Sequence, residues 1–573
     1  MLVPRPLLLL LLPLLGTGLL LRGPLHTTAR RAAPRQVWAQ KEGGGDAEPF
    51  NLLFTESLEE CQGRVCAFEP GSKVPAWLKG SLIRNGPGLF QAGGRRYTHL
   101  FDGMAKLTKY TFGGSGGDSS SVEFSAAFLR SEWFKRARGS DGELPPSITT
   151  GPVEPPWSAW ENFQALLTSQ QFDNVPVNIH QMGGPGGPWA AVTDAPVALE
   201  FSTADLSTKG RIKYASPVTG RGGVELFSTA HPATDSQGRT LNYFLELNPV
   251  SGNTAHIVRI DPQLQRTVVG SVPVGPIGIP YVHDISVTEN YAILAVWPIR
   301  ISNAALFNGR GFLPQLEWCP KEQPESKIYV FDLRASTATA GAAPVATFTA
   351  PAIFSYHHIN AYEQKGSVVL DVSGYSDAAI VNGPHAFAYL DNCKDAETRR
   401  KQARDGRWMR FELPVGDVVG GRVEVKELRA VDAHGQHFTS ELVTINPKFA
   451  GKRHRYSYGF TGFAGQGPDA GGFTDWAIVK LDHDGGSSEA ATVKVWKEAG
   501  SYPSEPIMVP RAAGASDDGD SEDVGVVLSQ VFDSKKRESF LLVLDAKTMQ
   551  ELGRAYLGLV CPVSFHGAWI DQV

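Results

Sequence analysis

The sequence has few cysteines, no excess of basic residues and no serine in the setting of a nucleophile elbow, and each absence excludes a class of protein. Its five cysteines are odd in number and scattered along 573 residues, which argues against a disulfide framework. Acidic residues outnumber basic ones by 59 to 54, so a nucleic-acid partner is disfavoured. The G-x-S-x-G match at residues 113–117, GGSGG, is a glycine run followed by further serines rather than by a helical pattern, so a metal-free hydrolase is disfavoured as well.

The first 41 residues lack acidic side chains altogether and carry five arginines. Their Leu-rich run over residues 7–21 is interrupted by proline and glycine and is short for a membrane span. A secretory signal peptide and a plastid transit peptide that ends near residues 37–40 both fit this pattern. The long arginine-bearing stretch after the apolar run and the odd cysteine count favour the plastid. We therefore predict a targeting peptide over residues 1–41 and a single folded domain over residues 42–573.

A pattern of two short strands joined by a polar turn recurs in the rest of the chain, whereas long amphipathic helical windows are scarce. The clearest examples are residues 197–212, 256–272, 327–336, 477–496 and 541–557. Hairpins at intervals of roughly 60–75 residues indicate an all-β propeller, because radial repetition protects strand edges. About 530 residues at that period correspond to roughly seven blades. A pair of β-sandwiches is the alternative.

Two segments favour helices, over residues 161–172 and 395–408. We expect the insertions between strands, with these helices, to form a helical and loop cap over one face of the propeller. The second segment is so rich in charged side chains that we expect it to be a solvated helix.

Seven short blocks resemble the successive motifs of the carotenoid cleavage oxygenases. They are GSLIRNGPGLF (80–90), THLFDGMAKL (98–107), TAHP (229–232), HDISVTENYAIL (283–294), HHINAYE (357–363), SYPSEPIMVP (501–510) and FHGAWI (565–570). They occur in the order of the family and cover nearly the whole chain from about residue 50 onward. The resemblance implies a seven-bladed propeller rather than sandwiches, and an oxygenase that uses non-haem iron.

The resemblance selects four of the 14 histidines as ligands of one Fe(II) ion that leaves positions open for O2, namely His231, His283, His357 and His566. Neutral imidazoles are good ligands for a divalent transition metal, and a set without cysteine or carboxylate suits ferrous iron. The four are 52, 74 and 209 residues apart, so local spacing alone does not identify them. Convergence of the inner strands of a propeller explains how they meet. In HHIN the ligand of the family is the first histidine, so His358 is expected to face the other side of the strand.

The resemblance also implies three glutamates that accept hydrogen bonds from ligand imidazoles and so fix their tautomer and orientation. Glu441 and Glu505 match two of these positions, and Asp194 stands at the third. Because aspartate is one methylene shorter, we expect its hydrogen bond to the imidazole, which we take to be that of His283, to be longer or water-bridged. Such a change typically lowers metal affinity about 10–100-fold.

RNGPGLF (84–90), THLFDG (98–103), VTENYAIL (287–294) and LEWCPKE (316–322) most resemble the plant carlactone synthases of strigolactone biosynthesis. Those enzymes act on a cis-apo-10′-carotenal, a C27 apocarotenal. The resemblance therefore implies an apocarotenoid substrate and either the same rearranging double oxygenation or a simpler cleavage. The 29 Phe, 15 Tyr and 12 Trp suffice to line an apolar tunnel. Three alternatives stay open: cleavage of full-length carotenoids such as β-carotene, isomerohydrolysis of retinyl esters, and a metal-free propeller that binds partners.

Carotenoids reside in membranes, so the mouth of a substrate tunnel is expected to dock on a bilayer. The segment 303–318 combines apolar side chains with Gly, Pro and nearby arginines, which suits interfacial insertion. We predict that its large apolar residues make this peripheral membrane contact, namely Leu306, Phe307, Phe312 and Leu313. The alternative is a lid that packs on the cap of the protein itself.

Overall fold

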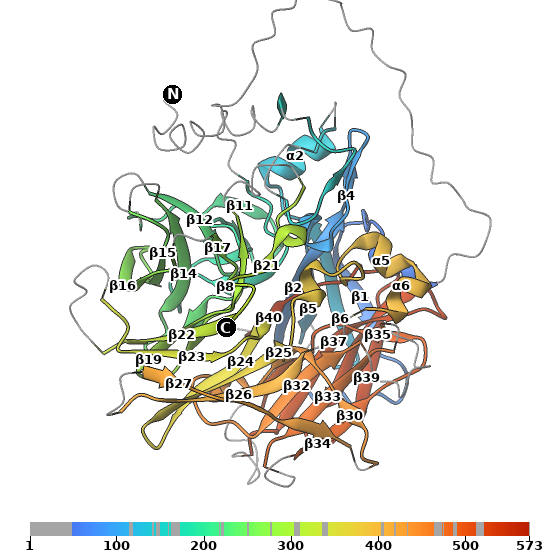
Figure 1. Cartoon of the computed structure of the whole chain (residues 1–573). Coiled ribbons are helices and arrows are strands. Elements are labelled where there is room, and N and C mark those ends of the chain that lie inside the picture. The colour runs from blue at the N-terminus through green and yellow to red at the C-terminus, as the bar shows by residue number, and fades with distance from the viewer. Residues whose placement is uncertain are drawn as a thin grey trace, which may run out of the picture.

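The computed structural model describes residues 49–571 apart from short internal stretches. Those stretches are residues 114–118, 140–141, 145–148, 159, 162–171, 217, 219–222, 249–250, 276–277, 303–309, 335–341, 403–405, 417–419, 433, 463–472, 474, 485–489 and 512–520. The predicted targeting peptide over residues 1–41 lies outside the described residues and stays a prediction. Figure 1 shows that the described chain consists mostly of strands.

The described strands form seven sheets of four to six strands, the blades of a propeller, and two smaller sheets. The first blade contains β1 (Cys61–Ala67), β6 (Ser121–Phe128), β5 (Met104–Phe112), β2 (Gly80–Leu89) and β40 (Gly567–Asp571). The second contains β11 (Thr208–Arg211), β10 (Ala198–Phe201), β9 (Trp189–Val192) and β8 (Asn178–Gln181). The third contains β12 (Val224–Ser228), β14 (Thr240–Leu247), β15 (Thr254–Ile260) and β16 (Arg266–Pro273), with β13 (Ala233–Thr234) paired to β14.

The other four blades follow in chain order. The fourth contains β18 (Ser286–Val287), β19 (Tyr291–Val296), β22 (Glu325–Asp332), β23 (Ala346–Pro351) and β27 (Gly420–Arg422). The fifth contains β24 (Phe354–Gln364), β25 (Ser367–Tyr375), β26 (Arg407–Pro414) and β28 (Val425–Glu427). The sixth contains β30 (His437–Phe438), β29 (Arg429–Val431), β34 (Ala490–Trp496), β33 (Ala477–Asp482), β32 (Tyr456–Thr461) and β31 (Glu441–Thr444). The seventh contains β35 (Ser501–Pro503), β37 (Gly525–Asp533), β38 (Glu538–Asp545) and β39 (Glu551–Tyr556), with β36 (Ile507–Pro510) paired to β37.

Short elements connect the blades. The small sheets contain β17 (Ile279–Pro280), β20 (Ile299–Ile301) and β21 (Glu317–Trp318), and β3 (Gln91–Ala92), β4 (Arg95–Tyr97) and β7 (Val153–Glu154). The described helices are η1 (Pro49–Phe54), η2 (Leu100–Asp102), α2 (Glu132–Arg138), η4 (Leu313–Gln315), α4 (Ala379–Asn382), α5 (Leu390–Lys394), α6 (Ala396–Arg400) and η5 (Pro447–Phe449).

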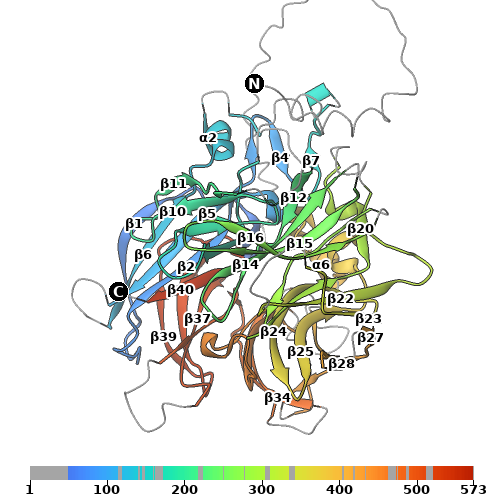
Figure 2. The same cartoon turned by 90° about the vertical axis from the view of Figure 1, so that its left-hand side faces the viewer.

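The first blade joins the two ends of the described chain. β40 pairs antiparallel with β2, with Gly80 opposite Asp571 and Arg84 opposite Gly567. Figure 2 shows β40 beside β2. This pairing closes the ring, because strands from the two ends of the described chain share one blade. It also brings His566, the residue before β40, next to Arg84 on β2.

Packing between neighbouring blades makes the frame rigid. Every residue of β19 is buried, and its sequence YAILAV is apolar throughout, as suits a strand covered on both faces. Side chains of the third, fourth and fifth blades merge into one core that includes Leu245, Ile293 and Leu370. Such close packing fixes the strand ends and loops that carry the polar side chains of the centre.

The predicted propeller is confirmed, and the predicted helical cap is not. Four of the five predicted hairpin segments coincide with β10–β11, β15–β16, β33–β34 and β38–β39. The fifth, residues 327–336, coincides with the single strand β22 and extends into residues that lie outside the described ones. The helix expected over 161–172 lies almost wholly outside the described residues. Within the segment 395–408, the described helical residues are those of α6. Its Arg399 is 2% exposed, so the expectation of a solvated helix is wrong at that residue.

The predicted insertion of Phe312 and Leu313 into a bilayer is also wrong. Phe312 is 8% exposed and Leu313 is fully buried, and both belong to the core. The Phe312 ring lies 5.7 Å from the ring of Tyr281, so it packs inward. Leu306 and Phe307 lie outside the described residues. In the described part of the chain, no helix combines the length and apolar character that a membrane crossing requires.

Candidate metal centre

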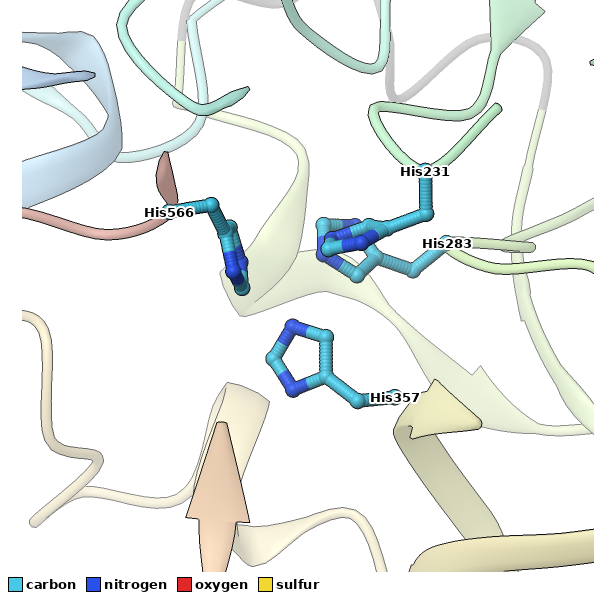
Figure 3. Close-up of side chains that lie close together, drawn as sticks. All are labelled: His231, His283, His357 and His566. Carbon is cyan, nitrogen blue, oxygen red and sulfur yellow. The ribbon is translucent and has the colours of Figure 1, made fainter. Parts of the chain in front are cut away.

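Four histidines from elements of four different blades converge, and Figure 3 shows their rings gathered around one point. They are His231 two residues before β13, His283 between β17 and β18, His357 in β24, and His566 directly before β40. One ligand nitrogen from each lies within 4.8 Å of those of the other three. The ring centroids of His231 and His566 are only 4.4 Å apart. The structure thus brings together all four histidines predicted as metal ligands.

β24 carries two adjacent histidines with different surroundings. Side chains alternate along a strand, so His357 and His358 project to opposite sides. His358 Nδ1 lies 2.8 Å from Ser286 Oγ, and its ring centroid is 6.1 Å from that of Trp297. The structure therefore places His357, and not His358, in the cluster, as expected.

A carboxylate accepts a hydrogen bond from Nδ1 of three of the four rings. The pairs are Asp194 Oδ2 with His283 Nδ1 at 2.8 Å, Glu441 Oε2 with His357 Nδ1 at 2.5 Å, and Glu505 Oε1 with His566 Nδ1 at 2.8 Å. With Nδ1 engaged, Nε2 is left as the ligand atom of each ring. The contact of Asp194 is direct and no longer than that of Glu505, so the expectation of a longer or water-bridged hydrogen bond is wrong.

His231 is held through its backbone. Its N–H donates to Thr229 Oγ1 at 2.7 Å, and among the described residues no carboxylate hydrogen-bonds to its ring. The Nε2 atoms of His231 and His357 are buried and have no hydrogen-bond partner. A buried polar atom without a partner is costly in free energy. Two such nitrogens within a cluster of imidazoles fit a divalent metal ion that they would coordinate.

Burial keeps part of the cluster unprotonated. Burial, together with the positive charge that neighbouring histidines would carry, lowers the pKa of His231 well below the ordinary histidine value. The same causes, joined by the charge of Arg84, lower the pKa of His566 well below that value. A histidine binds a metal through a neutral ring, so these two rings are ready to act as ligands at neutral pH.

The pKa values of the two glutamates at the centre are shifted in opposite directions. Burial raises the pKa of Glu505 to about 7, although the charge of Arg84 opposes the shift. Burial also acts to raise the pKa of Glu441, but the charge and hydrogen bond of His357 and the hydroxyl of Tyr375 outweigh it and lower the pKa overall. Glu441 is therefore the more firmly ionised of the two at neutral pH.

Each of these carboxylates also accepts a hydrogen bond from a second side chain. The sequence interpretation missed these three donors. They are Tyr281 on Asp194 Oδ2 at 2.9 Å, Tyr375 on Glu441 Oε1 at 2.8 Å, and Arg84 on Glu505 Oε2 at 3.4 Å. Two sequence signals pointed to them. Arg84 lies inside the block 80–90, and Tyr281 precedes His283 by two residues, the spacing that puts side chains on one side of an extended chain.

Aromatic rings border the histidines. Tyr356 is 6% exposed, and its ring centroid lies 5.3 Å from that of His283 and 4.8 Å from that of Phe354. Phe565, the residue before His566, has its ring 5.0 Å from that of Phe101. An apolar border of this kind excludes water and favours an apolar ligand.

The family follows from comparison with known proteins. The family model described as "Retinal pigment epithelial membrane protein" (RPE65) matches residues 54–571. The chain belongs to the RPE65 and carotenoid cleavage dioxygenase family. The rice protein "Carotenoid cleavage dioxygenase 8 homolog A, chloroplastic" is 29% identical, over 95% of this chain and 93% of that protein. The "Carotenoid isomerooxygenase" of Galleria mellonella is 27% identical, over 90% and 96%.

Solved structures of this family have the same propeller. A variant of the Synechocystis apocarotenoid oxygenase superposes with a TM-score of 0.69 at 20% identity, over 91% of this chain and 99% of that one. The structure described as cobalt-substituted Synechocystis apocarotenoid oxygenase also reaches a TM-score of 0.69, at 21% identity over 92% and 99%. The seven-bladed architecture of this carotenoid oxygenase family member is thus shared over nearly the whole length of both structures.

Proposed function

We propose that this protein is a non-haem Fe(II) dioxygenase that uses O2 to cleave a conjugated double bond of an apocarotenoid. The observation that carries the proposal is the cluster of four imidazoles that contains two buried, unpartnered Nε2 atoms. A ligand set of neutral nitrogens without thiolate or carboxylate suits ferrous iron. When bound, ferrous iron supplies the O2 chemistry that converts a carbon–carbon double bond into two carbonyl groups.

The chain itself orients the ligands and keeps water away. The carboxylates of Asp194, Glu441 and Glu505 fix the tautomer and direction of three imidazoles. The aromatic border that includes Phe101 and Tyr356 presents an apolar surface to a polyene. The proposed reaction asks no side chain to act as a general acid, general base or covalent nucleophile.

We propose a cis-apo-10′-carotenal as the substrate, in a reaction like that of the carlactone synthases. Relatives named carotenoid cleavage dioxygenase 8, from rice and Arabidopsis thaliana, are 29% and 28% identical to this chain. Cleavage of a full-length carotenoid is the second candidate, because a human relative named "Beta,beta-carotene 15,15'-dioxygenase" is 27% identical. The substrate assay below separates the two.

The assay uses the purified full-length protein, loaded with Fe(II) under nitrogen. It is mixed with the 9-cis apocarotenal or with β-carotene, isotopically labelled O2 is admitted, and the products are analysed by mass spectrometry. Labelled carbonyl products from the apocarotenal support the proposal. Product from β-carotene alone would contradict the substrate. Equal turnover after removal of iron would contradict the reaction itself and favour a metal-free protein.

We also propose that residues 1–41 direct the protein to the plastid, where residues 42–573 act as one domain. The rice and Arabidopsis relatives are named chloroplastic, which supports this localisation, whereas other relatives are named mitochondrial. A fluorescent protein fused to residues 1–41 and expressed in plant cells should enter plastids. Fluorescence in the secretory pathway or in mitochondria would contradict the proposal.

Peripheral membrane contact is proposed for Leu306 and Phe307. The apolar and basic composition of their segment supports it. Replacing both residues with Ser should reduce co-sedimentation of the protein with liposomes. Val345→Ser is the control, because Val345 is a surface residue that is 42% exposed. Unchanged co-sedimentation of the double variant would overturn the docking proposal.

A further inference from the structure

Each carboxylate at the metal centre accepts hydrogen bonds from donors of three kinds: an imidazole, a backbone N–H and a second side chain. The backbone donors are Ala230 on Asp194 Oδ1 at 3.1 Å, Leu442 on Glu441 Oε2 at 3.0 Å, and Gly567 on Glu505 Oε2 at 3.1 Å. The second side chains are Tyr281, Tyr375 and Arg84 in the same order. Three independent donors leave a carboxylate little freedom to rotate or shift.

The arrangements at Asp194 and Glu441 differ in which donor shares the carboxylate oxygen that faces the histidine. The Tyr281 hydroxyl donates to Oδ2, the oxygen that also accepts from His283 Nδ1, and the hydroxyl lies 3.3 Å from that nitrogen. At Glu441 the tyrosine donates to Oε1, whereas the histidine meets Oε2. Tyr281 therefore fixes the position of the one oxygen that orients His283.

Asp194 also connects two metal ligands. Its Oδ1 accepts the N–H of Ala230, the residue before His231, and its backbone oxygen accepts the N–H of Ser228 at 2.8 Å. The same residue thus holds the ring of His283 and the chain segment that carries His231. A displacement of the Asp194 side chain would move both ligands.

Packing restricts the side chain of Tyr281. Its side chain is 4% exposed, and its ring lies between Phe312 at 5.7 Å and Phe354 at 6.3 Å. It stands two residues before His283, and its hydroxyl lies 3.3 Å from the Nδ1 atom of that imidazole.

We propose that Tyr281 is a positioning residue of the metal centre, whose hydroxyl holds the short carboxylate of Asp194 against His283 and so keeps His283 and His231 in place for one metal ion. The inference rests on the proposed metal-binding function. The aspartate side chain is one methylene shorter than the glutamate side chain expected at this position. The hydrogen bond from the Tyr281 hydroxyl therefore provides the restraint that holds the carboxylate beside His283.

The test is a double-mutant cycle that measures metal affinity. Metal-stripped full-length protein is titrated with Co(II), and the visible absorption of the bound ion is recorded for wild type, Tyr281→Phe, Asp194→Asn and the double variant. Tyr281→Phe is expected to weaken Co(II) binding about 10-fold and to change the absorption band shape, because loss of an outer hydrogen bond typically costs about 10–100-fold in metal affinity. In the Asp194→Asn background the same substitution is expected to cost less than about threefold, because the two act through one contact.

Tyr375→Phe serves as the matched control. It removes the same hydroxyl from Glu441, so its cost should be equal in the wild-type and Asp194→Asn backgrounds. Thermal unfolding of the metal-free proteins checks that each variant is folded, and Asp194→Glu replaces Asp194→Asn if the latter cannot be purified. An equal cost of Tyr281→Phe in both backgrounds, or no cost in wild type, would overturn the inference. Wild-type protein that binds no Co(II) would overturn the proposed function and the inference with it.

Discussion

The carboxylate–histidine pairs at Glu505 and Asp194 perform one task with different chemistry. Both carboxylates stand 2.8 Å from their imidazoles. Behind Glu505 the supporting donor is the fully buried guanidinium of Arg84, on the strand that closes the ring. Behind Asp194 it is the neutral hydroxyl of Tyr281, and the Asp194 side chain is 16% exposed against 6% for Glu505.

The difference follows from the free energy of burying a charge. Burial removes water from Glu505 and raises its pKa to about 7, and the charge of Arg84 offsets part of that cost. Asp194 keeps more of its surface in contact with water, and its second side-chain donor is a neutral hydroxyl. Beside the paired strands β2 and β40, the positive charge of Arg84 supports the Glu505 carboxylate that orients His566. At Asp194, whose side chain is shorter, a hydrogen bond from the Tyr281 hydroxyl supports the carboxylate that orients His283.

The largest expected effect is a loss of metal affinity when a ligand histidine is replaced. It tests whether the His283–Asp194 and His566–Glu505 pairs hold one metal ion. His283→Ala and His566→Ala should each weaken Co(II) binding by at least about 100-fold, because loss of a ligand exceeds the cost of losing an outer hydrogen bond. His358→Ala is the control and should leave the affinity unchanged, since His358 pairs with Ser286. Tight binding that survives one of the two ligand substitutions would show that the regions do not share a metal.

The next effect separates the two pairs by charge. Arg84→Met leaves the buried Glu505 without its cation and is expected to lower the free energy of unfolding by about 3–5 kcal/mol. Arg84→Lys should recover part of this loss. Denaturant unfolding of the metal-free protein measures both. A loss below about 1 kcal/mol, the size expected for one neutral hydrogen bond, would show that charge does not matter at Glu505.

A buried carboxyl outside the metal centre, which accepts hydrogen bonds from backbone N–H groups, gives a baseline for the two pairs. Asp102 accepts the N–H groups of Thr150 and Gly151, and burial raises its pKa to about 7. Since the folded pKa lies above the unfolded one, this group stabilises the fold fully below the unfolded pKa, and the contribution is lost as pH rises to about 7. Relative to Asp102→Asn, wild-type stability should fall by up to about 1.4 kcal/mol per pH unit across that window. Denaturation at several pH values measures it, and parallel curves would contradict it.

The smallest effect compares three buried tyrosine hydroxyls in the metal-free protein. Tyr281→Phe and Tyr375→Phe each remove one hydrogen bond to a carboxylate and should lower the free energy of unfolding by about 1 kcal/mol. Tyr243→Phe should change it little or raise it, because the Tyr243 hydroxyl is buried without a partner. Denaturant unfolding measures all three variants. Equal losses at the three positions would show that the hydrogen bonds to the carboxylates do not contribute to the free energy of unfolding.

Much of the fold and the metal centre was predictable from sequence. Strand periodicity located hairpins such as β15–β16 and β38–β39, because alternation and turn residues are local properties. Motif blocks identified His357 over His358 and paired Asp194 with His283, because short motifs carry the residues of a family site.

Other features depended on contacts between distant segments. The apolar segment around Phe312 has the same sequence character whether it packs on its own core or on lipid, so its burial was not predictable. The 2.8 Å length of the Asp194 hydrogen bond did not follow from the shorter side chain, so side-chain length alone did not predict it. The support by Arg84 and Tyr375 joins residues far apart in the chain and has no local signature.

By itself, the sequence determined which strands form and which histidines and carboxylates belong to the centre, because these depend on local periodicity and on motifs. The tertiary structure alone decided how those groups are held: which donor stands behind each carboxylate, which apolar side chains face inward, and how β40 on β2 brings His566 to the other three histidines. The reason is physical: a buried polar atom or charge costs free energy unless it has a partner, and the tertiary structure decides which group lies close enough to be that partner.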